Sequence, residues 1–232
     1  MEKLVVFTGA GVSAESGIST FRDADGLWEG HDVMEVASPQ GWQSNQELVL
    51  DFYNQRRKQL LEVDPNSAHL DIQKLESKYD VSIVTQNVDD LHERAGSQDV
   101  IHLHGELFKV RSVQNESLVY NWKKDLNTGD LCEKGFQLRP HIVWFGEMVP
   151  MLEKAVQITS QADILLIIGT SLQVYPAASL ISYAPPQAKV YYIDPKPFIS
   201  HELKLRDHTV ISEKATIGMK TLLKTLKGDG DS

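Results

Sequence analysis

The sequence predicts an α/β fold built on a parallel β-sheet. Four short runs are apolar on both faces rather than alternating, which is typical of buried parallel strands. They are residues 4–8, 81–85, 164–168 and 190–193. Each run leads into a segment rich in Gly, Asn, Asp or Pro, with the sequences GAG, QNVDD, GTS and DPKP. Because ligands on open α/β sheets collect at the carboxyl ends of the strands, we expect the functional residues in these segments.

Composition limits the size and the partners of the molecule. At 232 residues, 41% of them hydrophobic and 24% charged, the chain suffices for one sizeable domain with a small inserted module. Its net charge of -9, from 23 basic and 32 acidic residues, argues against binding to nucleic acid or to an anionic membrane. No apolar run approaches the roughly 18–20 residues that span a bilayer, and the first run is too short for a signal peptide. We therefore expect a monomer in the cytoplasm.

Two segments between the predicted strands have other patterns and are interpreted as inserts. The first, residues 35–79, is mostly helical in pattern, and residues 46–61 carry apolar side chains at helical spacing. The Asp-Pro-Asn sequence at 64–66 interrupts this pattern. The second insert, residues 111–138, is polar and weakly periodic, with an Asn-Thr-Gly-Asp turn at 127–130.

The loop after the first strand fits the G-x-G-x-x-A form of a dinucleotide-binding fingerprint. Gly9 permits a tight turn, Gly11 lets backbone N–H groups approach a pyrophosphate, and the small Ala14 permits close packing. The motif is weak by itself, because a Gly-rich turn between a strand and a helix needs no ligand. The chain then continues as GISTFRDADGLW, without the clean helix, second strand and acidic residue of a hydride-transferring dehydrogenase. We interpret this stretch as a flap over a nucleotide.

Five blocks of sequence then occur in a fixed order along residues 3–195. They are GAGVSAESGISTFRDADGLW, TQNVDDLHERAG, HLHGELFKVR, VWFGE and GTSLQVYPAA. Together they resemble the sirtuins of bacterial type, which are NAD-dependent protein-lysine deacylases. The resemblance implies an inverted Rossmann-like sheet domain of residues 1–34, 80–108 and 142–232, with a smaller domain formed by residues 35–79 and 109–141. It also implies that the enzyme removes acyl groups from protein lysines and releases nicotinamide and O-acyl-ADP-ribose.

The resemblance carries NAD contacts onto matching positions of this chain. Phe21 would shield the ribose after nicotinamide departs, and Arg22 would lie near the phosphates. Asp194, where many sirtuins have Asn, would face the adenosine ribose. The NAD contacts implied are Gly9, Ala10, Gly11, Ser13, Ala14, Phe21, Arg22, Gln86, Asn87, Asp89, Gly169, Thr170, Ser171 and Asp194.

The catalytic residues implied are His104, Asn87 and Asp89. Asn87 and Asp89 would hold the nicotinamide and its ribose in a cleavage-ready pose, although loop capping is the alternative for both. The acyl oxygen would attack C1′ as nicotinamide leaves, and the neutral imidazole of His104 would then deprotonate a ribose hydroxyl. In a strand His102 and His104 would face the same side, so spacing does not choose between them. The resemblance chooses His104, in the His-Gly block.

The substrate contacts implied lie in two places. The VWFGE block would form an edge that pairs with the peptide, through Val143, Trp144, Phe145, Gly146 and Glu147. Tyr53 and Arg56, at i and i+3 on one helical face, match the Y-x-x-R pair of the subclass that removes succinyl, malonyl and glutaryl groups. An Arg fork beside a phenol suits a terminal carboxylate, and Ala37 would leave room for the longer chain. The alternative is that Tyr53 packs in the core and Arg56 is solvated.

Zinc is predicted to be absent, in contrast to most sirtuins, which bind it through four cysteines of the small domain. Cys132 is the one cysteine of this chain, and Ser112 stands where the first zinc cysteine is expected. One thiolate cannot build a tetrahedral site. We expect an apolar core to replace the metal, supplied by Trp122, Leu126, Leu131 and Phe136.

Two other functions use the same residues. Water or another acceptor could intercept the sugar, which would make the protein an NAD glycohydrolase or an ADP-ribosyltransferase. A non-catalytic NAD-binding module would bind NAD without releasing nicotinamide. The peptide-pairing VWFGE block favours a deacylase over the first, and the full set of Gln86, Asn87, Asp89 and His104 favours it over the second.

Overall fold

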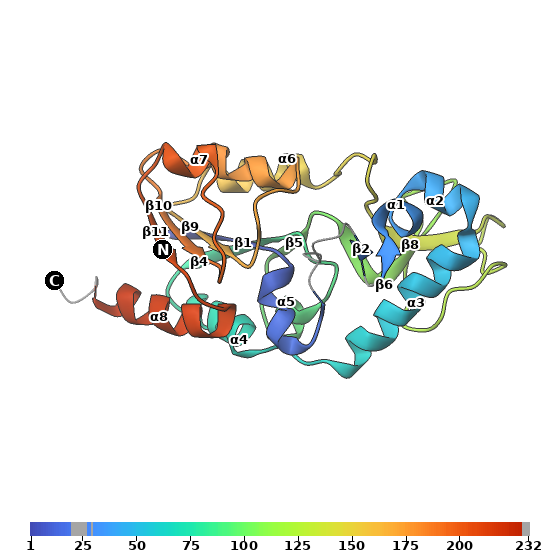
Figure 1. Cartoon of the computed structure of the whole chain (residues 1–232), viewed down its shortest axis with the longest axis horizontal. Helices are drawn as coiled ribbons and strands as arrows, with labels where there is room; N and C mark the ends of the chain where they lie inside the picture. The colour runs from blue at the N-terminus through green and yellow to red at the C-terminus, as the bar shows by residue number, and fades with distance from the viewer. Residues whose placement is uncertain (20–26, 29, 229–232) are drawn as a thin grey trace.

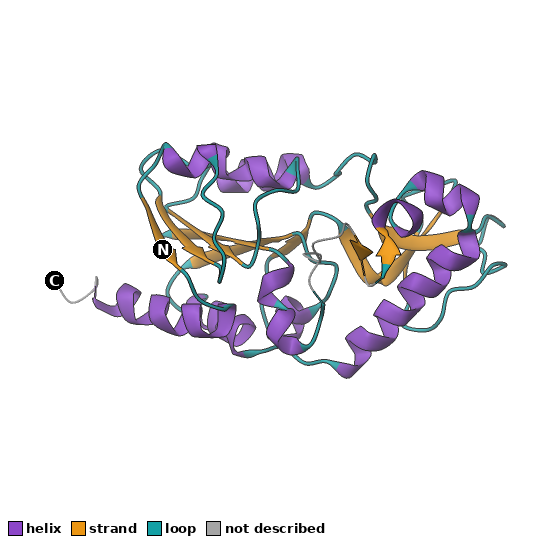
Figure 2. Ribbon diagram, in the orientation of Figure 1, coloured by secondary structure: helices purple, strands orange, loops and turns teal. Residues whose placement is uncertain are grey.

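The computed structural model describes residues 1–19, 27, 28 and 30–228. A six-stranded parallel sheet lies at its centre, in the strand order β11-β10-β9-β1-β4-β5 (Figures 1 and 2). Its strands are β1 Lys3–Thr8, β4 Asp80–Thr85, β5 Val100–His102, β9 Ile164–Ile168, β10 Lys189–Ile193 and β11 His208–Ile211. The four runs predicted as buried strands are confirmed as β1, β4, β9 and β10.

The strands missing from the sequence prediction are the two edges of this sheet, β5 and β11. Each has a neighbouring strand on one side only, and most of its side chains are half-buried. Such short edge strands lack the continuous apolar run that marks a central strand. β5 is important for the site, because its pairing with β4 brings His102 beside Thr85.

Helices cover both faces of the parallel sheet (Figure 1). Val5 and Phe7 of β1 pack toward one layer and Leu4 and Val6 toward the other, as the alternation along a strand requires. The first layer holds α6 Leu152–Thr159, η3 Ala177–Tyr183 and α7 His201–Lys204, and the second holds α4 Ser67–Leu75 and α8 Ala215–Gly228. Among the described residues, no helix is long and apolar enough to cross a membrane.

A second group of elements lies at the other end of the molecule, at the right of Figures 1 and 2. Its antiparallel sheet has the order β7-β6-β8. The strands are β6 Gly105–Ser112, β7 Val119–Asn121 and β8 Leu138–Ile142, and the helices are α1 Val33–Val36, α2 Pro39–Ser44 and α3 Gln46–Glu62. The antiparallel sheet with α1, α2 and α3 corresponds to the smaller domain that the sequence predicts. Shorter elements elsewhere in the chain are η1 Ala10–Val12, η2 Ala14–Ser16, β2 Leu27–Trp28, β3 His31–Asp32 and α5 Leu91–Arg94.

The helix expected at residues 46–61 is confirmed as α3. It begins after Asn45, whose side chain accepts a hydrogen bond from the amide of Leu48 at 3.1 Å. It ends shortly before Pro65, which fits poorly inside a helix. The next helix, α4, buries Ala68 and Ile72 in a cluster with residues of the parallel sheet. We therefore propose that the first insert of the small domain ends near residue 62 rather than at 79.

The prediction of an apolar core in the second insert is half right. Leu126 is buried, and Trp122 is partly buried in the same cluster with Cys132. Leu131 and Phe136 are 54% and 42% exposed, so their expected place in the core was wrong. Leu131 and Gln137 form an isolated bridge in this polar segment.

Candidate functional site

The loop after β1 and the loop after β9 cross at the carboxyl edge of the parallel sheet, and glycines in both loops permit the crossing. The Gly11 amide donates to the carbonyl oxygen of Gly169 at 2.8 Å. A Cβ on Gly11 would lie 2.6 Å from the Cα of Gly169, and Gly169 itself has φ +62°. The Gly11 amide therefore bonds within the protein, and the missing side chain allows the two loops to approach each other closely.

The segment after the crossing forms η1 and η2 instead of one long helix, in line with the departure from a dehydrogenase. Ala14 is exposed and does not provide the expected close packing, which Val12 supplies instead. Phe21 and Arg22 lie outside the described residues.

Ser13 ties this loop to the loop that follows β4. Its hydroxyl donates to Asp89 Oδ2 at 2.9 Å and accepts from Asn87 Nδ2 at 3.1 Å. All three side chains are buried, and burial raises the pKa of the Asp89 carboxyl. Asp89 Oδ1 also accepts from the amide of Leu91 at 3.1 Å, so the same residue caps α5. The structure thus brings Ser13, Asn87 and Asp89 together, as predicted.

A buried polar layer that the sequence analysis missed supports these residues. Thr85 Oγ1 accepts from the Asn87 amide at 3.0 Å and from Thr8 Oγ1 at 2.8 Å. His92 Nε2 lies 3.1 Å from Thr8 Oγ1, and the His92 ring stacks edge-on to His69 at 4.9 Å. Burial lowers the pKa of His69 to about 4 and that of His92 well below its usual value, so both rings are neutral at pH 7. The residues come from four separate elements, which no local motif could indicate.

The loops after β9 and β10 close the same edge of the sheet. Gln86 Nε2 donates to Thr170 Oγ1 at 2.9 Å, and Tyr192 donates its hydroxyl to the Thr170 carbonyl at 2.8 Å. Ser171, next to Thr170, is half-buried. Asp194 is buried and its Oδ1 accepts from the Lys196 amide at 2.8 Å. The predicted loop residues therefore share one edge, as parallel strands require.

His104 stands in the short link between β5 and β6 rather than in a strand. Its Nδ1 lies 3.0 Å from the carbonyl oxygen of Gln86, which can only accept, so Nδ1 carries the proton of the neutral ring. Its Nε2 makes no hydrogen bond with any residue that the structure describes, and is left as an acceptor. Burial lowers the pKa of His104, which keeps the ring neutral at pH 7. The ring is thus prepared to accept a proton at Nε2.

The Tyr53 and Arg56 side chains of α3 have different surroundings. Arg56 lines a small cavity that Asp89 and Leu107 also line, and its guanidinium lies 4.0 Å from the centre of the Phe52 ring. Tyr53 is not among the residues lining that cavity. Its hydroxyl is buried and accepts from Trp144 Nε1 at 3.0 Å, and burial raises its pKa well above the usual range. The geometry thus places Arg56, but not Tyr53, beside the loop that carries Asp89.

The VWFGE block follows β8 as a turn rather than as a strand. Gly146 takes φ +89°, and the Phe145 amide donates to the Ala37 carbonyl at 2.9 Å. The Val143 amide donates to the His104 carbonyl at 2.9 Å, which joins this turn to the link between β5 and β6. Trp144 and Ala37 are buried, while Phe145 is exposed.

Glu147 holds this turn through charges. Its carboxylate accepts from Arg139 Nη1 at 2.6 Å, from Arg111 Nη2 at 3.2 Å and from the Trp144 amide at 2.8 Å. The Arg139 guanidinium also lies 3.2 Å from the centre of the Trp144 ring. Burial would raise the pKa of Glu147, but the bonds from Arg139 and from the Trp144 amide, together with the charges of Arg139 and Arg111, outweigh burial and lower it. The side chain expected to face the peptide therefore supports the turn from within.

Replacing Glu147 with alanine is expected to lower the free energy of unfolding by about 3–5 kcal/mol, because it leaves two buried guanidinium groups without their carboxylate. Urea denaturation followed by circular dichroism measures the change. Asp125→Ala is the matched control, because its ion pair with Lys58 is exposed and contributes about 1 kcal/mol or less. Equal losses in the two variants would contradict a structural role for Glu147. The lowered pKa of Glu147 also means that its contribution is full above pH 4.5 and is lost as the pH falls through that lowered value.

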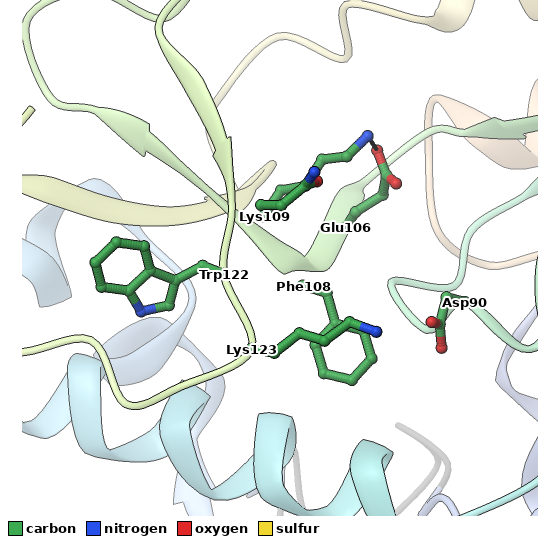
Figure 3. Close-up of a pocket in the computed structure, with 7 residues that line it drawn as sticks. Asp90, Glu106, Phe108, Lys109, Trp122 and Lys123 are labelled. Atoms are coloured by element: carbon green, nitrogen blue, oxygen red, sulfur yellow. Dashed lines mark hydrogen bonds and ion pairs between the residues drawn. The ribbon is translucent and has the colours of Figure 1, made fainter.

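A larger groove lies beside the loop that follows β4 (Figure 3). It has a volume of about 530 Å³, and Lys123 places its ammonium 4.9 Å from the centre of the Phe108 ring on its floor. Across it, Lys109 pairs with Glu106 at 2.6 Å. The Leu107 amide, beside this groove, donates to the Val88 carbonyl at 2.8 Å. Of the predicted site residues that the structure describes, none lines this groove.

Comparisons with known proteins agree with this geometry. The model of the Sir2 family matches residues 9–176. A protein of Helicobacter pylori named NAD-dependent protein deacylase is 60% identical over 226 residues, which cover 97% of this chain and 98% of that protein. A protein of Bacteroides thetaiotaomicron with the same name is 52% identical over 97% of this chain and 98% of its own length.

Two solved structures have the same fold. The crystal structure of a Sir2 homolog in complex with NAD superposes with a TM-score of 0.86 and 38% identity, over 98% of this chain and 90% of that one. A structure of Sir2 bound to an acetylated peptide superposes with a TM-score of 0.81 and 28% identity, over 97% of this chain and 93% of that one.

Proposed function

The chain belongs to the Sir2 family, and on this premise we propose that it is an NAD-dependent protein deacylase that removes acyl groups from protein lysines. The observation that carries the proposal is the match to deacylases along almost the whole of both chains. The site geometry supports it, because a neutral histidine, whose Nε2 has no hydrogen-bond partner in the described part of the chain, lies on a loop adjacent to that of a buried Asn and Asp. We propose His104, Asn87 and Asp89 as the catalytic residues.

The residues present suit NAD as a substrate. The cavity beside Asp89 is lined by Ile18, Trp28 and Leu107, and thus offers apolar walls next to a carboxyl group. Asn87 and Asp89 are fixed by Ser13 and so need little reordering when the nicotinamide end binds. We propose that the other NAD contacts are the predicted residues of the loops after β1, β4, β9 and β10.

His104 would act after nicotinamide has left. With Nδ1–H bonded to the Gln86 carbonyl, Nε2 could take the proton of a ribose hydroxyl. The lowered pKa favours the neutral form that this step needs. The hydroxyl oxygen would then attack the carbon of the imidate that forms when the acyl oxygen joins C1′. The lysine amine would leave that carbon, and water would add to it to give the O-acyl ester and a free C1′ hydroxyl. The free lysine and O-acyl-ADP-ribose are the products.

The acyl groups we propose are acetyl and, through Arg56, succinyl and malonyl. The Arg56 guanidinium lines the cavity beside Asp89, where a terminal carboxylate of a longer acyl chain could form paired hydrogen bonds. Tyr53 would act indirectly, since its hydroxyl is bonded to Trp144 in the core. The protein partner would pass along the turn that carries Val143 and the exposed Phe145.

Zinc does not fit the small domain of this chain. The Cys132 sulfur lies 3.5 Å from Ser112 Oγ inside an apolar cluster with Leu126 and Leu138, and a single thiol cannot form a structural zinc site. We therefore propose a metal-free small domain. Elemental analysis of the purified protein is expected to find less than a tenth of a zinc ion per chain, and a chelator is expected to leave the melting temperature unchanged. Zinc at one ion per chain would contradict the proposal.

A peptide assay tests the function. Matched acetyl-lysine and succinyl-lysine peptides are incubated with the protein, with and without NAD, and followed by mass spectrometry. We expect the acyl groups to be lost only when NAD is present. Loss of the acyl group without NAD, or nicotinamide release without deacylation, would contradict a deacylase.

A further inference from the structure

His102, two residues before the proposed base, has a different environment from His104. It is the last residue of β5, and its side chain is 7% exposed. Its Nδ1 lies 2.9 Å from the carbonyl oxygen of Asn87, and its Nε2 lies 2.7 Å from Glu93 Oε1. Both ring nitrogens of His102 therefore face an acceptor, whereas His104 has one nitrogen free.

The two acceptors define the protonation of the His102 ring. A carbonyl oxygen can only accept a hydrogen bond, and an ionised carboxylate can only accept one. Both bonds form together only if both nitrogens carry protons, so the geometry calls for the charged imidazolium. Burial disfavours that charge, but Glu93 outweighs burial and raises the pKa of His102, while His102 in turn lowers the pKa of Glu93.

The bond from His102 completes the support of Asn87. The amide of Asn87 donates to Thr85 Oγ1 at 3.0 Å, its side chain donates to Ser13 Oγ at 3.1 Å, and its carbonyl oxygen accepts from His102. Of these three bonds the last carries a charge, and bonds to charged donors are the stronger ones. A loss of that bond would release one side of the residue that holds the nicotinamide.

We propose that His102, held in its charged form by Glu93, is a positioning residue that fixes Asn87 for the release of nicotinamide. This inference rests on the proposed deacylase function and adds a residue to it. The charged and titratable groups around the ring are Glu93 and His92 of α5, Glu106 of β6 and Asp89 of the loop after β4. The carboxylates among them favour the charged ring, and the neutral His92 does not oppose it.

The two histidines then need opposite protonation states. His104 acts in its neutral form. Because its pKa is lowered, the ring is neutral at pH values above that lowered pKa. His102 works charged and its pKa is raised, so its contribution is full at low pH and is lost as the pH rises through that raised value. The rate of nicotinamide release in the first turnover should therefore have an alkaline limb that belongs to His102.

The test uses His102→Gln and Glu93→Gln in the full chain. We expect His102→Gln to slow nicotinamide release about tenfold or more at pH 7 and to remove the alkaline limb, because Asn87 is less well placed. Glu93→Gln, at a side chain that is 39% exposed, should shift the alkaline limb to lower pH. His208→Gln is the control: His208 also bonds a backbone carbonyl, that of Arg206 at 3.0 Å, but it lies on the far edge strand β11.

Three outcomes would overturn the inference. One is an alkaline limb in His102→Gln equal to that of the wild type, and another is a limb unmoved in Glu93→Gln. The third is an NMR titration of the wild-type histidines that places the pKa of His102 below 6.5. The titration needs no turnover, so it tests the charged ring even if the protein releases no nicotinamide. The absence of release in the wild type would instead contradict the proposed function.

Discussion

Replacing His104 with alanine is expected to lower the rate of deacylation by about 10² to 10⁴-fold, the usual contribution of a general base. Nicotinamide release in the first turnover should fall far less, because His104 would take its proton only after the C1′–N bond has broken. Single-turnover assays that follow nicotinamide and deacylated peptide separately measure the two steps. His201→Ala, at an exposed position of α7, is the control.

The pH dependence of the wild type sharpens this prediction. Because burial lowers the pKa of His104, the acid limb of kcat/KM should lie below pH 6.5, the usual value of a free histidine. That limb should be missing from the residual activity of the His104→Ala variant. An acid limb that persists there, or equal losses of both steps, would contradict the role of His104 as the base.

Replacing Arg56 with methionine is expected to raise KM for a succinyl-lysine peptide about ten- to a hundredfold and to leave KM for an acetyl-lysine peptide nearly unchanged. Losing a charge-assisted hydrogen bond costs about 1.5–3 kcal/mol, and 1.4 kcal/mol corresponds to a factor of ten. Methionine keeps the length and the apolar stem of the side chain. Steady-state kinetics on matched peptides measure the effect.

Lys58→Met controls for the change of charge on α3, since Lys58 is exposed and pairs with Asp125 at 3.0 Å. An equal rise of KM for both peptides in Arg56→Met would contradict the carboxylate clamp. Tyr53→Phe separates the second member of the pair. Because the Tyr53 hydroxyl bonds to Trp144 in the core, its removal should affect the two peptides alike.

The central sheet could be predicted from the sequence because its strands are buried on both faces. β1, β4, β9 and β10 therefore have continuous apolar runs, whereas the edge strand β5, which precedes the proposed base, does not. Leu131 and Phe136 show the same limit, since apolar residues in a polar insert can stay exposed. Hydrophobic pattern thus predicts the centre of this fold better than its margins.

The sequence likewise predicts one part of the candidate site and misses another. Asn87, Asp89 and His104 stand in loops directly after or between strands, so their motifs and the strand order were enough to bring them together. His69 and His92 support that site from α4 and α5, and their meeting depends on how the helices pack. The loop crossing at Gly11 also depends on Gly169, far away in the chain. Contacts between distant segments are the part that motifs do not record.

The fate of the acyl group tests the central claim most directly. The wild-type protein is incubated with NAD and an acyl-lysine peptide. The small-molecule products, including nicotinamide, are identified and quantified by mass spectrometry. For a deacylase we expect one acyl-ADP-ribose and one deacylated lysine for each nicotinamide released. ADP-ribose without the acyl mass, ADP-ribose attached to the peptide, or free carboxylic acid formed without loss of NAD would contradict it.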